Sequence, residues 1–588
     1  MGIGYQNVAA CATLVLVMVM TEIAGICANS STLLHSPCLE RERQALVKFK
    51  ASLNDSSNTL SSWHGDDCCR WEGIGCDNVT GHVVMLDLAT PYLKCWRSMP
   101  EEEYWLRRDD EDNCDLLRYQ YLEAGNVNSS LLELEYLTHL DLTGNRFHWN
   151  PIPMFIGSMQ RLRYLSLSGA GFGGKIPNNL GNLTNLHFLD LSWNEFSPDS
   201  NINWISQLPL LEHLNIKGSF IYNEFQVNII NLTITAPKLQ FLSLANNGLN
   251  VPNLDALQNM TSLVHLDLSV NSITSIPSWF GNFKKLEYLD LSGCGLHGPI
   301  PNAFQTATSI EFLDLSWNHF DSLPYWFHKF EKLKHLLLSS NNFQGSIPDV
   351  LQNMTSIESL DLSDNSFISV PSWSGNFKKL EYLDLSWCYL HGPIPNAFQN
   401  ATSIESLDLS GNNFDSLSFW FHKFQKLKHL YLSSNNFQGS IPNVLQNMTS
   451  LVHLDLGGNN LTSVSSWFDN FKKLEYLSLS ECGLHGPIPN AFQNATSIEF
   501  LDISWNNFDS LPSWFHKFEK LKHLSLSSNN FQGSIPDVLQ NMTSFESLDL
   551  SDNSFTSLPS WFVELKKLAY LSLSSNKLTS MEYSISFI

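Results

Sequence analysis

The stretch LEYLDLSWCYL, residues 380–390, is one copy of the pattern that decides the fold of this 588-residue chain. The pattern, L-x-x-L-x-L-x-x-N/C-x-L/F/I, recurs nineteen times between Leu137 and Leu578. Its leucines point into a coil of chain and the residues between them point out, as on a short strand. A single coil cannot bury its leucines alone, so neighbouring coils are expected to stack about 4.8 Å apart. The sequence therefore predicts a solenoid rather than several globular domains.

This pattern is the signature of a leucine-rich repeat. We expect an α/β fold: a right-handed, horseshoe-shaped solenoid whose concave parallel β-sheet runs from about Val83 to Leu573. The Asn eight steps after the first Leu turns the chain out of the strand and can bond to backbone groups of the adjacent coil. Cys294, Cys388 and Cys482 replace this Asn at intervals of 94 residues. They lie too many coils apart to pair, so buried free thiols are predicted.

A second pattern specifies the type of repeat. Six coils continue after the Asn step as Leu/Phe-x-Gly-x-Ile-Pro, for example residues 296–301, and residues 172–177 form a seventh. This resembles the extracellular leucine-rich repeats of plant receptor-like kinases, receptor-like proteins and polygalacturonase-inhibiting proteins. The coils between them lack the Gly, so two types of coil alternate. Starts at residues 263, 357, 451 and 545 differ by 94 each, which indicates recent duplication of a 47-residue, two-coil unit.

The N-terminal region predicts a secreted protein. An apolar run of thirteen residues, 8–20, is too short to span a bilayer and is typical of a signal peptide, which we assign to residues 1–28. Residues 29–82 closely resemble the plant N-terminal leucine-rich-repeat cap. Their four cysteines allow three pairings. The resemblance implies the disulfides Cys38–Cys68 and Cys69–Cys76, beside a short amphipathic helix that covers the first coil with Leu39, Leu46, Phe49 and Leu53.

Residues 83–588 form the repeat array, with an acidic insertion at about residues 91–130 that departs from the repeat phase and is expected to interrupt the sheet. Cys95 and Cys114 bracket this insertion, and the sequence leaves open whether they form a third disulfide. The acidic run is expected to be a solvated loop; a docking site for a basic partner is the alternative.

Several kinds of chemistry are disfavoured. The net charge of −23 argues against nucleic acid as a partner. Residues 169–174 match a dinucleotide-binding fingerprint, but no helix begins there to hold a pyrophosphate. The chain has no zinc-type spacing, nucleophile elbow or kinase signature. We therefore expect a protein that is not an enzyme and that needs no cofactor or metal.

Glycosylation sequons recur on alternate coils. Five of them are 47 residues apart and each lies four residues before a strand, while Lys precedes the strand in the coils between. One edge of the solenoid should therefore alternate glycan and Lys, either to protect the surface or to limit the footprint of a partner. We predict glycans at Asn78, Asn128, Asn182, Asn231, Asn259, Asn353, Asn400, Asn447, Asn494 and Asn541.

The concave face is the candidate binding surface. The second variable position of the repeat is aromatic or His in sixteen of nineteen coils, and tryptophans follow two steps beyond the strand in four coils. Aromatic anchors in a polar frame suit recognition of a peptide or protein. The alternative is that these residues are only part of the family's repeat, copied by duplication. The predicted ligand-binding residues are Phe312, Trp317, Tyr382, Trp387, Tyr431, Tyr476, Phe500 and Trp505.

The resemblance implies the extracellular ligand-recognition ectodomain of a plant receptor-like protein in defence signalling, with a protein or peptide ligand and a membrane co-receptor kinase. No apolar run long enough to span a membrane follows the array, so we expect a C-terminally truncated member whose last coils, from Phe545 onward, fray. The expected location is the outer face of the plasma membrane, or the apoplast for a secreted form. The alternatives are a secreted inhibitor of microbial cell-wall hydrolases, resembling the polygalacturonase inhibitors, and a non-functional fragment.

Overall fold

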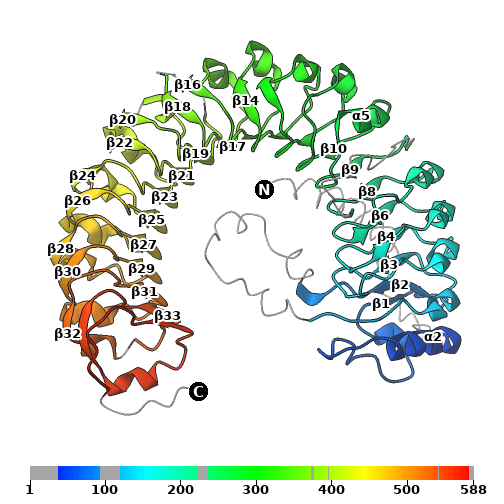
Figure 1. Ribbon diagram of the computed structural model, residues 1–588, viewed down its shortest axis with the longest axis horizontal. Coiled ribbons are helices and arrows are strands. Elements are labelled where there is room, and N and C mark those ends of the chain that lie inside the picture. Colours follow the sequence, from blue (N-terminus) through cyan, green and yellow to red (C-terminus); the bar gives the residue numbers. More distant parts are fainter. Residues whose placement is uncertain are drawn as a thin grey trace. The chain divides into compact units, whose positions relative to one another are not determined.

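The computed structural model describes residues 37–92, 120–220, 236–371, 377–394, 396–540 and 542–581 (Figure 1). The chain divides into two compact units, Met1–Asn318 and His319–Ile588, which we call unit 1 and unit 2 and describe separately. The predicted signal peptide, Cys95, Cys114, Asn231 and Asn541 lie outside the described residues.

Unit 1 begins with the cap. Helix α2 (Glu40–Ala51) buries Leu46 and Phe49, and strand β1 (Ile74–Cys76) pairs antiparallel with β2 (Val83–Asp87). The disulfides are Cys38–Cys68 and Cys69–Cys76, as the resemblance implied.

The buried face of α2 differs from the prediction at its start. Leu39 precedes the helix and is 38% exposed, whereas Glu42 is buried. The Glu42 carboxylate accepts hydrogen bonds from His82 Nδ1 at 2.9 Å and from the Val83 backbone N–H at 2.7 Å, so it joins the cap to the first strand of the array. A buried carboxylate is tolerated here because both of its oxygens have donors.

The array of unit 1 is a parallel sheet in register. The insertion does not interrupt it, contrary to our expectation, because β2 pairs directly with β3 across those residues, with Met85 opposite His139. The sheet continues in chain order through β3 (His139–Asp141), β4 (Tyr164–Ser166), β6 (Phe188–Asp190), β8 (His213–Asn215), β9 (Phe241–Ser243), β10 (His265–Asp267), β11 (Tyr288–Asp290) and β13 (Phe312–Asp314).

Unit 2 repeats this arrangement, and in each unit the strands line the inner edge while short 3-10 helices form most of the outer edge (Figure 1). Its strands follow in the order β15 (His335–Leu337), β17 (Ser359–Asp361), β19 (Tyr382–Asp384), β21 (Ser406–Asp408), β23 (His429–Tyr431), β25 (His453–Asp455), β27 (Tyr476–Ser478), β29 (Phe500–Asp502), β31 (His523–Ser525), β33 (Ser547–Asp549) and β35 (Tyr570–Ser572).

Outer strands explain the two-coil unit of the sequence. In a coil with the Gly-x-Ile-Pro segment, a short strand such as β16 (Gln344–Ser346) pairs with a strand of the following coil, here β18 (Ser366–Ser369). The same pairing joins β20 (His391–Pro393) to β22 (Asn413–Ser416) and β24 (Gln438–Ser440) to β26 (Asn460–Ser463). Gly345 has φ +76° at the bulge in the first pair, a conformation that favours Gly. On the outer side, each coil with the Gly-x-Ile-Pro segment is therefore paired with the coil of the other type that follows it.

The Asn step bonds adjacent coils as predicted. Asn412 Nδ2 donates to the carbonyls of Leu385 in the preceding coil and Leu409 in its own, at 2.8 and 3.1 Å, and its Oδ1 accepts from the Leu390 N–H. Where Cys388 replaces Asn, its buried free thiol is 3.2 Å from the Leu362 carbonyl of the preceding coil. The prediction of buried free thiols is confirmed for all three cysteines at this step.

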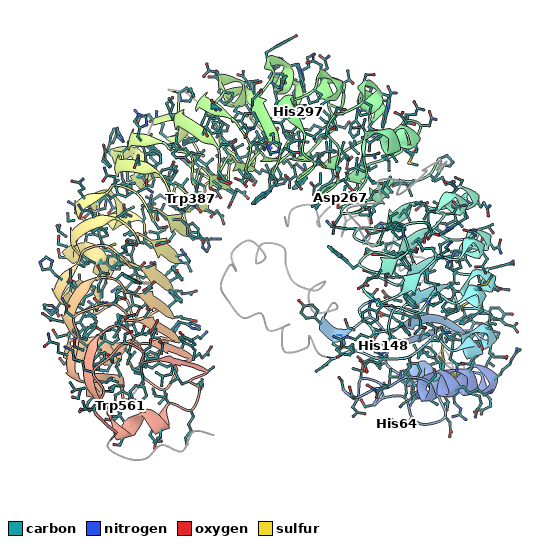
Figure 2. All side chains as sticks on the ribbon, in the orientation of Figure 1. His64, His148, Asp267, His297, Trp387 and Trp561 are labelled. Carbon is teal, nitrogen blue, oxygen red and sulfur yellow. A yellow bond between two sulfur atoms is a disulfide. The ribbon has the colours of Figure 1, made fainter. Side chains whose placement is uncertain are left out.

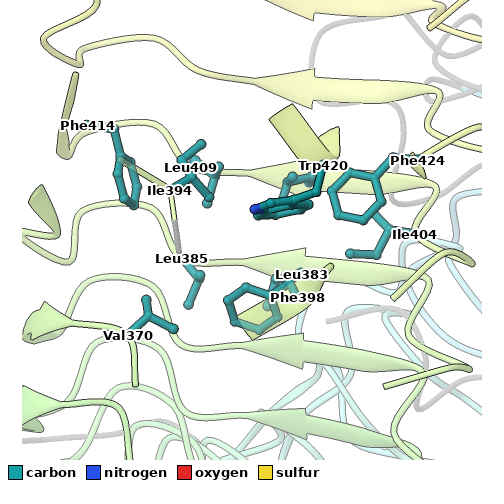
Figure 3. A pocket seen from close by; sticks show the side chains of 11 residues that line it. Val370, Leu383, Leu385, Ile394, Phe398, Ile404, Leu409, Phe414, Trp420 and Phe424 are labelled. Atoms are coloured by element: carbon teal, nitrogen blue, oxygen red, sulfur yellow. The ribbon is translucent and has the colours of Figure 1, made fainter. Parts of the chain in front are cut away.

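The interior of unit 2 is a closed apolar column. A gap of about 10 Å³ lies between coils. Figure 3 shows the apolar side chains that line it, which include Leu383, Phe398 and Trp420. A space of this size barely accommodates one water molecule, so it is not a ligand site. At the last coil, Leu571 is 37% exposed, whereas Leu524 of an earlier coil is 2% exposed.

Candidate functional site on the strand face

Aromatic rings at the second variable position form a continuous stack in unit 1. His139, Tyr164, Phe188, His213, Phe241, His265, Tyr288 and Phe312 follow one another with ring centroids 3.9–4.3 Å apart and planes within 15° of parallel. Stacking covers both faces of most rings. Phe312 is only 2% exposed, so its assignment as a ligand-binding residue was wrong. The in-register spacing of about 4.8 Å is close to the thickness of a ring, and neighbouring rings bury one another.

The stack is shorter in unit 2, because serines replace rings at Ser359, Ser406 and Ser547. Tyr476 stacks on His453 at 3.8 Å and on Phe500 at 4.3 Å, and Tyr431 contacts His453 at a tilt. The predicted binding residues Tyr382, Tyr431, Tyr476 and Phe500 are all half-buried. They contribute ring edges to the surface rather than whole faces.

Burial controls the charge states of this face. Desolvation lowers the pKa of His453 to about 3 and the pKa values of His335 and His429 to about 4, so these rings are neutral at neutral pH. Desolvation and then the neighbouring Asp408 raise the pKa of Asp384. Ser386 stabilises the ionised form of Asp384 through its backbone N–H at 2.9 Å.

The residue before the Asn step has a distinctive backbone. It has positive φ in all nineteen coils, between about +52° and +79°. Six coils place Gly here and four place Trp. A left-handed backbone is strained for residues with a Cβ, and unstrained for Gly. Because every coil shares this backbone, the large exposed side chains of the four tryptophans make them the strongest candidates.

These tryptophans project from the strand face. In unit 1, Trp193 and Trp317 are 56% and 64% exposed; in unit 2, Trp387 and Trp505 are 60% and 66% exposed. Figure 2 shows Trp387 on the strand-lined side of unit 2. Three of the four were predicted from sequence, and the structure makes each of them accessible to a ligand.

The next coil supports two of the indoles with a glycine. The Trp193 ring lies so close to Gly218 that a Cβ there would stand 2.8 Å from the ring, and the Trp387 ring approaches Gly411 even more closely. Tyr389 follows Trp387, also has positive φ and is 69% exposed. Unit 2 therefore exposes two aromatic residues within three positions of one coil, Trp387 and Tyr389, the first of them packed against Gly411.

Tyr389 and Gly411 were not predicted from the sequence, and the internal duplication carries a signal for Tyr389 only. Three coils that start 94 residues apart contain the identical outer segment LHGPIPNAFQ at residues 296–305, 390–399 and 484–493. Just before this segment, the same coils carry Gly295, Tyr389 and Gly483. The duplicated coils thus differ at this position, where their outer segment is identical.

The sequons are accessible at one edge. Asn182, Asn353 and Asn447 end equivalent 3-10 helices, and Asn259, Asn400 and Asn494 are likewise exposed. Asn78 is exposed, while Asn128 is half-buried and caps helix η3 (Ser129–Glu133) by accepting from the Ser130 N–H. Glycosylation at these positions stays a prediction.

Comparison with known families agrees with this architecture. Residues 39–77 match the leucine rich repeat N-terminal domain, and leucine-rich-repeat models match residues 237–296, 323–367, 418–461 and 511–555, with further repeats between residues 161 and 518. The chain therefore contains a leucine rich repeat N-terminal domain followed by leucine rich repeats. Its similar proteins include plant receptor-like proteins, and this similarity agrees with a plant leucine-rich-repeat receptor-like protein.

The relatives include two tomato (Solanum lycopersicum) proteins. The chain is 39% identical to Receptor-like protein EIX1 over 42% of its own length and 42% identical to Receptor-like protein EIX2 over 24%. It is 28% identical to Receptor-like protein 6 of Arabidopsis thaliana over 45%. These matches cover only 23%, 12% and 26% of the three relatives.

Solved structures show the same fold. The ectodomain of the Arabidopsis receptor kinase HAESA, in complex with an extended IDA peptide hormone, gives a TM-score of 0.56 at 27% identity, over 92% of this chain and 86% of that one. The Leptospira interrogans protein LIC12759 gives 0.51 at 27% identity, over 71% and 92%. In the part of this chain that the structure describes, no helix is long and apolar enough to cross a bilayer.

Proposed function

We propose that this chain is the extracellular ligand-recognition region of a plant receptor-like protein that acts in defence, and that it binds a peptide or protein without catalysis. The observation that carries the proposal is the exposure of Trp387 and Trp505 on strained, left-handed backbone of the strand face. Solvent-exposed indoles on strained backbone contribute little to the fold, whereas Trp is a frequent anchor in binding interfaces.

The surface between these two tryptophans suits an extended ligand. Five coils separate Trp387 from Trp505, about 24 Å at the strand spacing. Four residues occupy the same step between them: Gly411, Ser434 and Gly458 are small and leave the surface low, and the fourth is the exposed Glu481. An extended peptide of roughly seven residues spans this distance.

The residues at the step before Asn also favour a positively charged ligand. Along unit 2 the step before Asn carries exposed Asp364, Glu481 and Asp552 but no Lys or Arg. Carboxylates beside exposed indoles attract Lys and Arg side chains through charge and cation–π interactions. We therefore infer a ligand with basic residues.

Secretion and partners follow from the same proposal. The two disulfides of the cap suit an oxidising, extracellular environment. HAESA has been solved with the peptide hormone IDA together with the co-receptor SERK1. By analogy, this chain binds its ligand at the cell surface and acts with a membrane co-receptor kinase.

Selection of peptides tests the proposal directly. A display library of random dodecapeptides is selected on the full glycosylated chain, and the selected peptides are titrated against the wild type and against Trp387→Gly/Trp505→Gly. Six coils already carry Gly at this step, so the variant should fold. We expect basic peptides whose affinity falls on the order of tenfold or more in the variant. Failure to select any peptide, or equal binding by the variant, would contradict the proposal.

A further inference from the structure

The lysines of unit 2 are concentrated on one edge. Fifteen of the sixteen lysines between residues 319 and 588 fall within four residues before, or one residue after, the first apolar residue of a coil, and this segment has no Arg. Because the strands stack in register, equivalent positions of successive coils form columns along the edge. A basic edge is unexpected in a protein whose net charge is −23.

One of these columns is strictly periodic. The residue immediately before each coil start alternates between Lys and Ser over eleven coils. The Ser side chains are short, and Ser450 and Ser497 donate to carbonyls of the preceding coil at 2.8 Å, so they lie against the backbone. The lysines of the column are Lys332, Lys379, Lys426, Lys473, Lys520 and Lys567, which we call the Lys column.

The lysines of the Lys column have no partner among the residues that the structure describes. All six side chains are exposed, and none has an ion pair or hydrogen bond to another described residue. The next column differs, because Lys428 pairs with Glu405 at 2.8 Å and Lys522 pairs with Glu499 at 2.7 Å. Lys428 and Lys522 are thus paired inside the fold, in a column that carries six glutamates and three lysines, whereas the lysines of the Lys column have no partner among the described residues.

We propose that the Lys column of unit 2 is a docking edge for a linear acidic polysaccharide with regularly spaced carboxylates. Two coils separate successive lysines, about 10 Å at the strand spacing, and the column extends on the order of 50 Å. A polymer of identical units can place a carboxylate next to each lysine of such a row in an equivalent geometry. A folded protein with irregularly spaced charges cannot do this along the whole row.

Two other polyanions fit the column less well. Nucleic acid carries a charge about every 3.4 Å along each strand, far denser than this row. A flat anionic membrane requires close approach of the whole edge, but exposed sequons at Asn353, Asn400, Asn447 and Asn494 lie on the intervening coils. Glycans there would hold a bilayer away and leave gaps for a thin chain.

The test uses the full glycosylated chain and polygalacturonate as the probe, at 0.15 M ionic strength, where exposed charges are screened beyond about 8 Å. One variant replaces the six lysines of the column with Gln. A second replaces them with Arg, which keeps the charge. A third, the matched control, changes Lys428→Gln and Lys522→Gln in the paired column.

We expect the wild type, the Arg variant and the control to bind polygalacturonate, and the Gln variant to lose affinity on the order of a hundredfold. Fully methyl-esterified polymer should not bind. The proposal is overturned by absence of binding to the wild type, by equal binding of the Gln variant, or by preference for anionic vesicles or polyglutamate over polygalacturonate. The peptides selected on the full chain are expected to bind the strand face and not the Lys column. Their titration against the Gln variant therefore shows whether the strand-face site is still intact.

Discussion

The indole of Trp387 lies directly against the Cα of Gly411 in the following coil, close enough that any Cβ on Gly411 would clash with the ring. Both residues have left-handed backbone, with φ +54° for Trp387 and +64° for Gly411. The left-handed backbone of Trp387 and the missing side chain of Gly411 therefore let an exposed indole pack against the next coil.

Replacing Gly411 with Ala should displace the Trp387 ring. Part of the loss of stability, about 1–2 kcal/mol, comes from the left-handed backbone alone. Gly392→Ala is the matched control, because Gly392 has φ +77° but nothing near its missing Cβ. Chemical denaturation should show a larger loss for Gly411→Ala than for Gly392→Ala, and only Gly411→Ala should weaken binding of a selected peptide. Equal behaviour of the two variants would mean that the ring is free to move.

Truncation of two aromatic residues in one coil should change the stability of unit 1 by very different amounts. Phe312 is buried in the ring stack and Trp317 is exposed. We expect Phe312→Ala to lower the free energy of unfolding by roughly 3–5 kcal/mol, and Trp317→Ala to change it by no more than about 0.5 kcal/mol. Similar losses in thermal or denaturant unfolding would show that the stack does not contribute to the stability of unit 1.

Acid should destabilise unit 2 through its buried histidines. Burial lowers the pKa of His453 to about 3 in the folded state, whereas an unfolded His titrates near 6.5. The unfolded chain therefore binds the extra proton first, so stability is lost as the pH falls below about 6.5 and continues to fall toward pH 3. The loss from this one group is about 2 kcal/mol at pH 5.

His453→Phe should keep the stack on Tyr476 and remove this part of the acid sensitivity. The raised pKa of Asp455 acts in the opposite direction but is common to both proteins, so it cancels in the comparison. The control is His485→Phe, which changes an exposed His. Unfolding free energies are measured from pH 8 to pH 4.5. The wild type and the control should lose the same amount of stability over this range, and His453→Phe should lose less. Parallel curves for all three proteins would contradict the assignment.

The edge of alternating sequons should carry glycans. Asn353, Asn400, Asn447 and Asn494 are exposed at equivalent positions, and Asn541 continues their 47-residue spacing in the sequence. Mass spectrometry of the protein secreted from plant cells should find hexosamine on most of these five residues. Unmodified Asn at all five would show that the chain does not pass through the secretory pathway.

The repeat pattern was sufficient to predict the solenoid, because each leucine position has one inward direction. The cap and the pairing of its disulfides were predicted from the resemblance to the plant N-terminal cap, and the cysteines alone left three pairings open. The repeat pattern could not separate buried rings from exposed ones on the strand face. Phe312 and Trp317 both belong to outward positions, and only the in-register spacing shows that Phe312 is covered by Tyr288 while Trp317 stands free. The Gly411 support was equally invisible, because it depends on how one coil contacts the next.

Site-specific cross-linking tests the central claim, that the strand face of unit 2 binds the ligand, most directly. A benzophenone amino acid is placed singly at Trp387, at Trp505, or at Phe419, which is 77% exposed at the start of the 3-10 helix η13 (Phe419–Lys423) away from the strand face. Each protein is irradiated with a selected peptide. We expect cross-links from positions 387 and 505 and none from 419. Cross-links from 419, with none from the other two positions, would contradict it.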